Sequence, residues 1–314
     1  MKRKVNLVGQ NTLTVSLPSK WAKNYGIKKG DEIEILEDRN KVIVSQSALR
    51  EEKKHIEIKL PKMYFESIEW LIRVLYIQGY DSVKLIFDYD TVHHERLKQN
   101  MSVLDLISYE LKRLMGFEIV DSGKNFCLLK CLSKETTDEF DISLKRIFII
   151  LNEAIKEIGR ALEIGRKGLA LYGQDVHDQI TRLIAYDLRT LNKIGYKDDK
   201  KTLLLYHLLW KIDDIVDLIK YWSREIDKKT QVKNYEISKI LRQLSILFNE
   251  AYLVYYKFSL EKVSEWFMER EELRKELIKL NIKSSKQERR HIAYIEQILE
   301  ELFKIVVIQM SLNY

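Results

Sequence analysis

The sequence predicts a multidomain, mainly α-helical protein with an N-terminal β module, a small α/β domain and two C-terminal three-helix bundles. The chain has 314 residues, which is long enough for two or three domains. It contains only 2 prolines and 11 glycines, and 32% of its residues are charged, a composition typical of long helices. Apolar residues also recur at helical spacing from Asp138 to the C-terminus.

The first 45 residues show the alternation of apolar and polar side chains that is typical of short strands. The alternation occurs over 5–7 and again over 13–17, on either side of a turn at 9–11. A short helix is expected over 19–25 and a second hairpin around 38–40. A module of this size buries too little apolar surface to be stable alone. We therefore expect a homodimer that forms through this module.

Basic residues are concentrated in the same module. The first thirty residues contain seven Lys or Arg side chains and no Asp or Glu, and this excess equals the net charge of the whole chain, +7. On an ordinary surface, acidic residues are interspersed with basic ones. A basic excess confined to one end of a chain indicates a polyanion-binding module. The alternative is that these charges only keep the module soluble.

The stretch resembles the SpoVT/AbrB family of swapped-hairpin DNA-binding domains. The resemblance lies in four successive elements: a basic strand at 3–5, a turn and strand at 9–13, a turn into a helix at 17–21, and a last turn and strand at 26–33. It implies a swapped-hairpin β module over 1–47 whose first strands intertwine in an obligate dimer and present basic residues to double-stranded DNA, which is the expected partner. The same fold also serves in antitoxins that bind a partner toxin, which is an alternative for this module.

The resemblance implies DNA-binding roles for six residues. These are Lys2, Arg3 and Lys4 on the DNA-facing strand, Asn11 in a flexible turn, and Lys20 and Lys23 beside the helix.

The segment after the module is polar and charged over 46–54, which predicts a linker. From 55 to 133 the pattern has the order β-α-β-α-β-β, which predicts a small α/β domain. Its second helix is expected over 92–115, with His93 and His94 solvated at the helix start.

Cysteine usage and hydropathy indicate the cellular compartment in which the protein is expected. Cys127 and Cys131 are expected on one strand, about 13 Å apart, which is too far for a disulfide. Two free thiols are typical of a reducing compartment, so a cytoplasmic protein is expected. No apolar run is long enough for a transmembrane helix, and no apolar segment follows the basic N-terminus as in a signal peptide.

The C-terminal half is predicted to contain six helices, near 139–171, 175–195, 200–227, 233–258, 261–281 and 285–312. Gly173 is expected to break the chain between the first two. The segments 149–154 and 246–251 share the pattern of three apolar residues followed by Asn-Glu-Ala. The repeat predicts two bundles, over 138–228 and 233–314.

Asp213 and Asp217 are four residues apart, which places both carboxylates on one face of a helix. Their repulsion calls for compensation by a metal ion, another cation or solvent. The tandem bundles resemble the PhoU family of phosphate-signalling proteins, in which acid-x-x-x-Asp motifs bind iron or zinc in some members. The segment 213–217 matches that motif, but Gln179 and Thr181 replace the partner acids. A divalent metal at Asp213 and Asp217 is one interpretation, and a solvated acidic face is favoured.

The succession of an AbrB-like domain, a small α/β domain and PhoU-like bundles resembles archaeal phosphate-uptake regulators. It implies a DNA-binding transcription regulator rather than an enzyme, with phosphate-transport components as candidate partners of the helical half. The alternative is a signalling adaptor that docks on a phosphate transporter or kinase and uses the N-terminal module only to dimerise. A hydrolase is disfavoured because neither His177 nor His207 has a recognisable catalytic spacing, and His177 is expected at a helix start.

Overall fold

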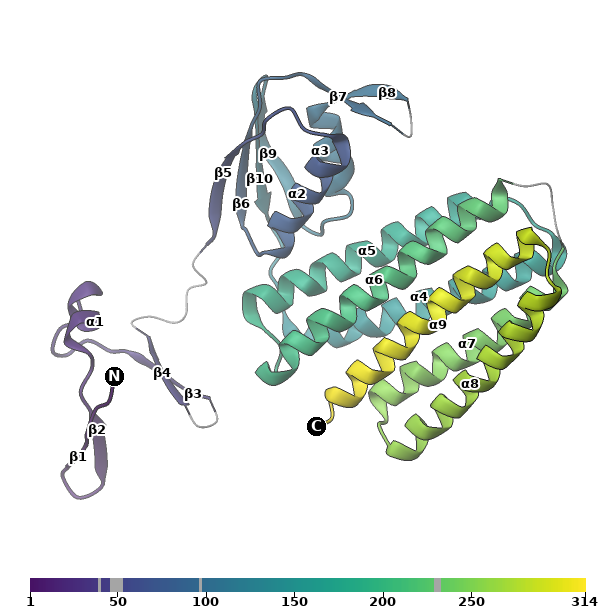
Figure 1. Cartoon of the computed structure of the whole chain (residues 1–314). Helices are drawn as coiled ribbons and strands as arrows, with labels where there is room; N and C mark the ends of the chain where they lie inside the picture. The colour runs from purple at the N-terminus through teal and green to yellow at the C-terminus, as the bar shows by residue number, and fades with distance from the viewer. Residues whose placement is uncertain (39–40, 46–52, 96–97, 229–232) are drawn as a thin grey trace. The chain divides into compact units, whose positions relative to one another are not determined.

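The computed structural model describes residues 1–38, 41–45, 53–95, 98–228 and 233–314. They form two compact units, Met1–Lys53 and Lys54–Tyr314 (Figure 1). The linker predicted over 46–54 lies, apart from its last two residues, outside the described residues. Helices predominate, as predicted, and none of the described ones is long and apolar enough to cross a bilayer.

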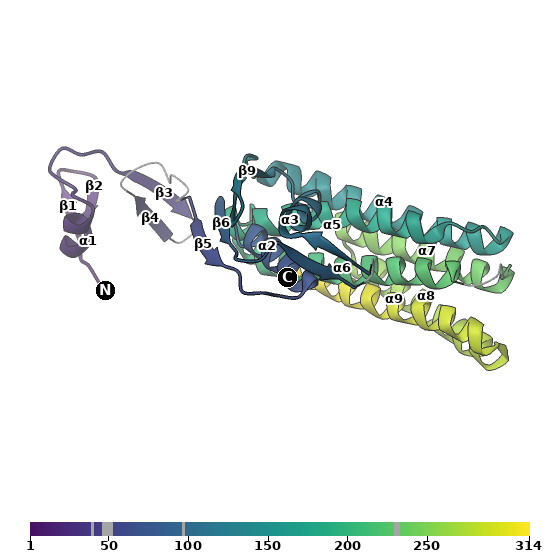
Figure 2. The same ribbon diagram turned by 90° about the horizontal axis from the view of Figure 1, so that it is seen from above.

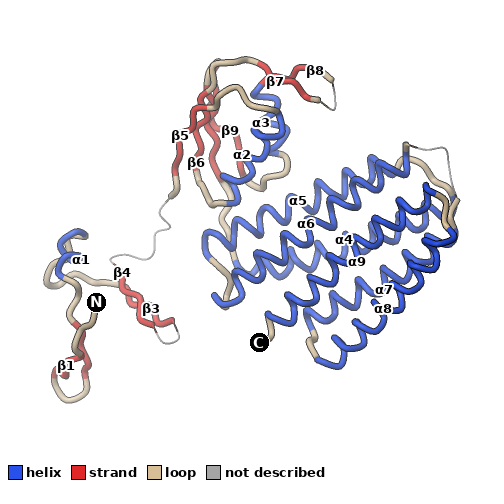
Figure 3. Tube along the Cα trace, viewed as in Figure 1, coloured by secondary structure: helices blue, strands red, loops and turns tan. Residues whose placement is uncertain are grey.

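The N-terminal unit consists of two hairpins and a short helix (Figure 3). Its elements are β1 (Val5–Val8), β2 (Thr12–Val15), α1 (Ser19–Asn24), β3 (Glu34–Asp38) and β4 (Lys41–Ser45). β1 and β2 pair antiparallel with Leu7 opposite Leu13, and Gly9 turns the chain with a φ of 68°. The turn of the second hairpin, at 39–40, lies outside the described residues. None of the residues described in this unit is buried, so one copy of the module has no core of its own.

The second unit begins with an α/β half, over 54–133, which contains a four-stranded sheet in the order β5-β6-β10-β9. The helical half follows it. The elements of the α/β half are β5 (His55–Lys59), α2 (Phe65–Ile77), β6 (Ser82–Ile86), β7 (Thr91–His94), β8 (Gln99–Ser102), α3 (Val103–Leu111), β9 (Phe117–Gly123) and β10 (Phe126–Cys131). β5 and β6 are parallel and joined by α2, whereas β10 is antiparallel to both of its neighbours. Cys127 and Cys131 both lie on β10 and are free thiols, as predicted.

The helix predicted over 92–115 is wrong in its first half. Residues from Thr91 to Ser102 form the hairpin β7–β8, and the helix begins only at Val103. Ser102 caps it, because its Oγ accepts a hydrogen bond from the Asp105 amide at 3.0 Å. The alternation around Val92, which is buried between exposed neighbours, is a strand pattern that the longer helical periodicity concealed.

Six helices follow among the residues described from Thr137 onward, as predicted (Figure 2). They are α4 (Thr137–Ile164), α5 (Leu169–Ile194), α6 (Asp199–Asp227), α7 (Tyr235–Tyr256), α8 (Leu260–Lys283) and α9 (Lys286–Ser311). α5 packs on α6 and α4, α4 packs on α7, and α9 packs on α6 and α7. α2 also packs on α5, and this contact joins the α/β half to the helical half within one unit. The domain boundaries proposed at 133–138 and 228–233 stay predictions.

The break predicted at Gly173 is also wrong. α4 ends at Ile164, and the chain turns at Gly165 and Gly168, whose φ angles are 75° and 88°. Gly173 lies inside α5, where a Cβ atom would come within 2.6 Å of the Ser223 Cβ on α6. Glycine is thus needed there for close helix packing rather than for a turn.

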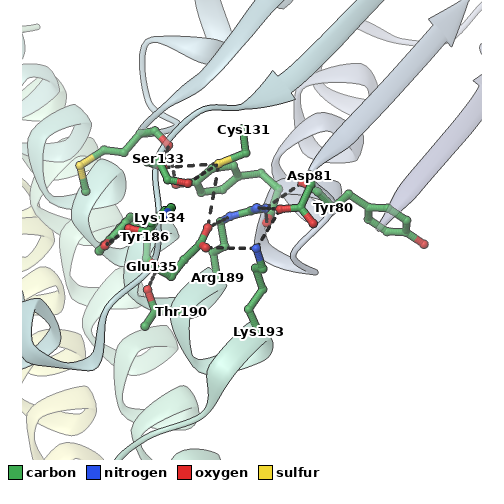
Figure 4. Close-up of polar contacts among 12 residues, drawn as sticks. Tyr80, Asp81, Cys131, Ser133, Lys134, Glu135, Tyr186, Arg189, Thr190 and Lys193 are labelled. Atoms are coloured by element: carbon green, nitrogen blue, oxygen red, sulfur yellow. Dashed lines mark hydrogen bonds and ion pairs between the residues drawn. The ribbon is translucent and has the colours of Figure 1, made fainter. Parts of the chain in front are cut away.

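A buried polar network joins the α/β half to α5 (Figure 4). The fully buried Arg189 guanidinium donates to the Tyr76 and Tyr80 carbonyls at 2.8 and 2.9 Å, to Asp81 at 3.1 Å, and to Glu135. Lys193 donates to the same two carboxylates at 2.8 and 3.1 Å. The carbonyls belong to the end of α2 and the residues just after it, where a helix leaves acceptors unpaired. The network therefore fixes α2 on α5 at a defined position.

Candidate nucleic-acid interface and polar cavity

The six residues predicted to contact DNA are all exposed. Lys2, Arg3 and Lys4 precede β1, so in a single copy they lie on the segment before the strand and not on the strand itself. Asn11 lies in the turn between β1 and β2. Lys20 and Lys23 lie on α1, whose first turn closes with a 2.9 Å bond from the Ala22 amide to the Pro18 carbonyl.

An apolar groove of about 860 Å³ lies beside these basic residues. It is lined by Arg3, Leu13, Val15, Ser16, Leu17, Pro18, Trp21, Ile33, Ile35, Val42 and Val44. Leu13, Ile35 and Val42 are 70%, 63% and 62% exposed. Apolar side chains gathered in this way on a monomer mark an interaction surface.

The comparison with protein families bears on this unit. Residues 8–53 match the family model described as antidote-toxin recognition MazE, bacterial antitoxin. The module is an AbrB-type domain. No curated protein and no solved structure matches the chain. The AbrB-type module fits DNA-binding or antitoxin-type regulation, and the resemblance of the helical half to PhoU proteins stays a prediction.

A polar cavity of about 140 Å³ lies within the second unit, where α2 and the residues around α3 face α5 and α6. It is lined by Phe65, Glu66, Glu69, Trp70, Arg73, His94, Tyr109, Arg113, Gln174, His177, Asp213, Asp217, Lys220 and Tyr221. His94, which was expected at an exposed helix start, is half-buried and its ring centroid lies 3.9 Å from that of Phe65.

Asp217 is compensated by two side chains of the protein. His177 Nε2 lies 3.2 Å from its Oδ1, and Lys220 Nζ donates to the same oxygen. Burial alone would raise the pKa of Asp217, but the hydrogen bonds from His177 and Lys220 outweigh burial and lower the pKa to about 2. His177 Nδ1 lies 3.0 Å from Asp178, so each ring nitrogen of His177 faces a carboxylate oxygen.

Asp213 has the opposite environment. Its Oδ1 is buried and has no hydrogen-bond donor among the described residues. Burial, and to a smaller extent the charge of Asp217, raise the pKa of Asp213 to about 6. Asp213 is half-buried, so the expectation of a solvated acidic face is contradicted only for its Oδ1.

The two Asp residues also bear on the metal interpretation. Among the residues that the structure describes, no group of three or more His, Cys, Asp or Glu side chains is placed to hold a metal ion. Two carboxylates are far fewer than the six or so oxygen ligands of a hard divalent cation.

The arginines of the cavity are bonded to carboxylates. Arg73 makes a bidentate pair with the fully buried Glu110, at 2.7 and 3.1 Å. Arg113 reaches Asp178 at 2.9 Å and Glu110 at 3.2 Å. These pairs join α2 to the end of α3 and α3 to α5, so they position the cavity walls.

Most residues of this cavity were not predicted from the sequence. His177 is expected at a helix start, whereas α5 begins at Leu169 and His177 is buried. One signal was present: His177 is spaced by three and four residues from Ile180 and Thr181, both of which are buried. Another was Lys220, three residues after Asp217, which is the spacing of an intrahelical ion pair.

Proposed function

We propose that the protein is a dimeric, DNA-binding transcription regulator in which two AbrB-type modules combine into one basic surface. The observation that supports this most directly is the absence of buried residues in the described part of the module, beside a set of exposed basic residues. A second copy that covers the apolar groove would supply the missing core. Two copies of Lys2, Arg3 and Lys4 would then lie on one assembly.

The chemistry of the basic residues suggests different roles. Contacts from Lys to phosphate position a protein on DNA without reading its sequence. Arg3 is the best candidate for reading a base, because a guanidinium can bond to the two acceptors of guanine. Arg3 also lines the apolar groove, so its side chain would lie at the border of the proposed dimer interface.

The test is fluorescence anisotropy of the full-length protein with duplex DNA at several salt concentrations. If all six charges of the two N-terminal arms (residues 2–4) reach phosphates, log affinity falls against log salt with a slope of about −5. Lys2→Ala should weaken all sequences about equally and flatten the slope, and Arg3→Ala should also reduce selectivity.

Lys145→Ala is the matched control, because it removes one exposed positive charge from α4 in the other unit. Sedimentation of Arg3→Ala must show an unchanged dimer, since Arg3 borders the groove. Undetectable binding at low salt would overturn the proposal. It would also be overturned if Lys2→Ala and Arg3→Ala bound DNA like Lys145→Ala.

A second candidate function is that of an antitoxin, because the matched family is described by its recognition of a toxin. A toxin segment would then occupy the apolar groove. This function predicts that a co-expressed toxin protein is neutralised and that neutralisation is lost in groove variants. Control of phosphate uptake is a further proposal, and mapping DNA association in cells with phosphate as the variable tests it.

A further inference from the structure

A buried hydrogen bond joins the end of α6 to the start of α9. The indole N–H of Trp222 donates to His291 Nδ1 at 2.8 Å, across 69 positions of the sequence. Trp222 is fully buried and His291 is 6% exposed, so the bond is shielded from water. Tyr294 stacks on Trp222 with the ring centroids 5.8 Å apart, which holds the indole in place. The contact between α6 and α9 therefore includes a titratable acceptor.

The bond determines which form of His291 the fold accepts. An indole N–H can only donate, so Nδ1 must accept with its lone pair and carries no proton. In a protonated imidazole both ring nitrogens are donors, and Nδ1–H would then point at the indole N–H. Protonation of His291 and its bond to Trp222 therefore exclude each other. Histidine is the side chain that ordinarily changes its charge between about pH 5 and 8.

The charged groups around His291 come from α9 itself and from the three helices that pack on it, α6, α7 and α8. On α9, the Glu288 carboxylate interacts electrostatically with His291. Asn234, which caps α7, donates to that carboxylate at 2.9 Å. Glu236 at the start of α7 and Lys283 at the end of α8 are exposed.

On α6, Glu225 lies three residues after Trp222 and pairs with Arg290 of α9 at 2.6 Å. The carboxylates of Glu288 and Glu225 would attract an imidazolium, so a proton on His291 has counter-charges within the fold. The conflict with Trp222 remains, because the indole has no acceptor to offer.

We infer that Trp222 and His291 form an acid-sensitive latch between α6 and α9, closed by their hydrogen bond at neutral pH and released when His291 takes up a proton. Release leaves the buried indole N–H without its acceptor, which destabilises this contact. The effect is local, because Trp222 lies near the end of α6 and His291 near the start of α9. The inference does not depend on DNA binding.

NMR spectroscopy of the full-length protein with ¹⁵N-labelled tryptophan tests the latch. Trp222→Phe identifies the indole N–H resonance of Trp222 among those of the 5 tryptophans. Between about pH 7.5 and pH 5 we expect this resonance to move with a single midpoint in the wild type. It should stay in place in His291→Gln, whose amide oxygen can accept the bond at every pH in this range. His207→Gln is the matched control, because His207 on α6 is exposed, and it should respond like the wild type.

Urea denaturation of the same proteins measures the energetic effect. When the pH falls from about 7.5 to 5, the unfolding equilibrium constant of the wild type should rise about fivefold more than that of His291→Gln, since one neutral hydrogen bond contributes about this factor. His207→Gln should again follow the wild type.

Two results would overturn the inference: a Trp222 resonance that does not respond to pH in the wild type, or an equal response in His291→Gln. If His291→Gln fails to fold, the ¹⁵N spectrum of the His291 ring in the wild type decides. A ring that carries its proton only on Nε2 at neutral pH, and that titrates with the same midpoint as the Trp222 resonance, supports the latch. A proton on Nδ1 at neutral pH, or two different midpoints, contradicts it.

Discussion

At the residue scale, Asp213 and Asp217 show how two like side chains on one helix acquire opposite properties. The pKa of Asp213 is raised to about 6, chiefly by burial, so the folded protein holds a proton there more tightly than the unfolded chain does. The pKa of Asp217 is lowered to about 2, because its hydrogen bonds from His177 and Lys220 outweigh burial. Ionisation of Asp213 therefore destabilises the fold, and ionisation of Asp217 stabilises it.

We predict that Asp213→Asn and Asp217→Asn change the free energy of unfolding in opposite directions at pH 7.5. The ionised Asp213 destabilises the fold above pH 6, so its removal should stabilise by about 1–3 kcal/mol, an effect that vanishes near pH 4. The ionised Asp217 stabilises the fold above pH 4, and this contribution is lost as the pH falls toward 2. Asp217→Asn should therefore destabilise the protein at pH 7.5. The expected change is only about 1 kcal/mol, because the Asp217 side chain is 41% exposed and solvent screens its charge.

Urea denaturation at pH 7.5 and pH 4 measures both changes, with Asp214→Asn as the neutral control. A destabilising effect of Asp213→Asn at pH 7.5 would contradict the conclusion that burial of this carboxylate costs more than its neighbouring positive charges return.

The sequence alone was sufficient to place Asp213 and Asp217 on one helical face and to state that their repulsion needs compensation. It was not sufficient to name the partners from other elements. His177 comes from another helix, and the pairing of Arg73 with Glu110 joins residues 37 positions apart. Such contacts depend on tertiary packing, which periodicity does not specify.

At the element scale, the contact of α5 with α6 depends on Gly173. Alanine normally stabilises a helix relative to glycine by about 1 kcal/mol. Here the added methyl group would meet Ser223 Oγ and Cβ at 2.5 and 2.6 Å. We predict that Gly173→Ala instead destabilises by about 1–3 kcal/mol, as overpacking of a core does.

Thermal or urea denaturation measures the effect, and Ser223→Gly in the same chain is the test of its cause. The double variant should recover most of the stability that Gly173→Ala loses, because the opposing Cβ is gone. If the two substitutions are simply additive, the close approach is not the reason.

The second prediction at this scale concerns the attachment of α2 to α5. Arg189→Leu leaves Glu135, whose side chain is 1% exposed, with Lys193 as its remaining basic partner. Breaking a buried pair in this way costs about 3–5 kcal/mol. Lys156→Ala, which breaks a pair with Glu153 that is about half exposed, should change stability by less than about 0.5 kcal/mol. Equal effects of the two variants in urea denaturation would contradict the proposed role of the network.

The elements themselves were largely predictable, and the two errors have one cause. Gly173 was interpreted as a break because glycine commonly ends helices, and residues 92–102 were interpreted as a helix because apolar residues recur there at helical spacing. In both places a tertiary contact decides the outcome: the packing of Gly173 on Ser223, and the hairpin in which Val92 is buried.

At the scale of the whole molecule, the exposed groove of the AbrB-type module predicts self-association. We expect the full-length protein to sediment as a dimer at micromolar concentration. Leu13→Lys should weaken the dimer at least about tenfold, because it places a charge in the proposed interface. Leu171→Lys is the matched control, since Leu171 on α5 is 77% exposed and Leu13 is 70% exposed.

Analytical ultracentrifugation over a range of concentrations measures both variants. A wild-type monomer would exclude this assembly, and a dimer that Leu13→Lys leaves intact would place the interface elsewhere on the chain.

The sequence predicted the division between the basic module and the rest of the chain, because charge and periodicity change together there. The structure places that division at Lys53 and Lys54. The way in which the α/β half and the helical half share one core was not predictable, since it rests on the network of Arg189 and on the cavity between α2 and α6.

The exposed apolar strands of the AbrB-type module also have a genetic consequence. Pairing through them would join copies whatever charges their N-terminal arms carry. A chain that lacks Lys2 and Lys4 would still pair with intact chains, and at equal expression only about one quarter of the dimers would contain two intact copies. Such an allele is expected to be dominant. An allele with Leu13→Lys, whose product pairs poorly, is expected to be recessive.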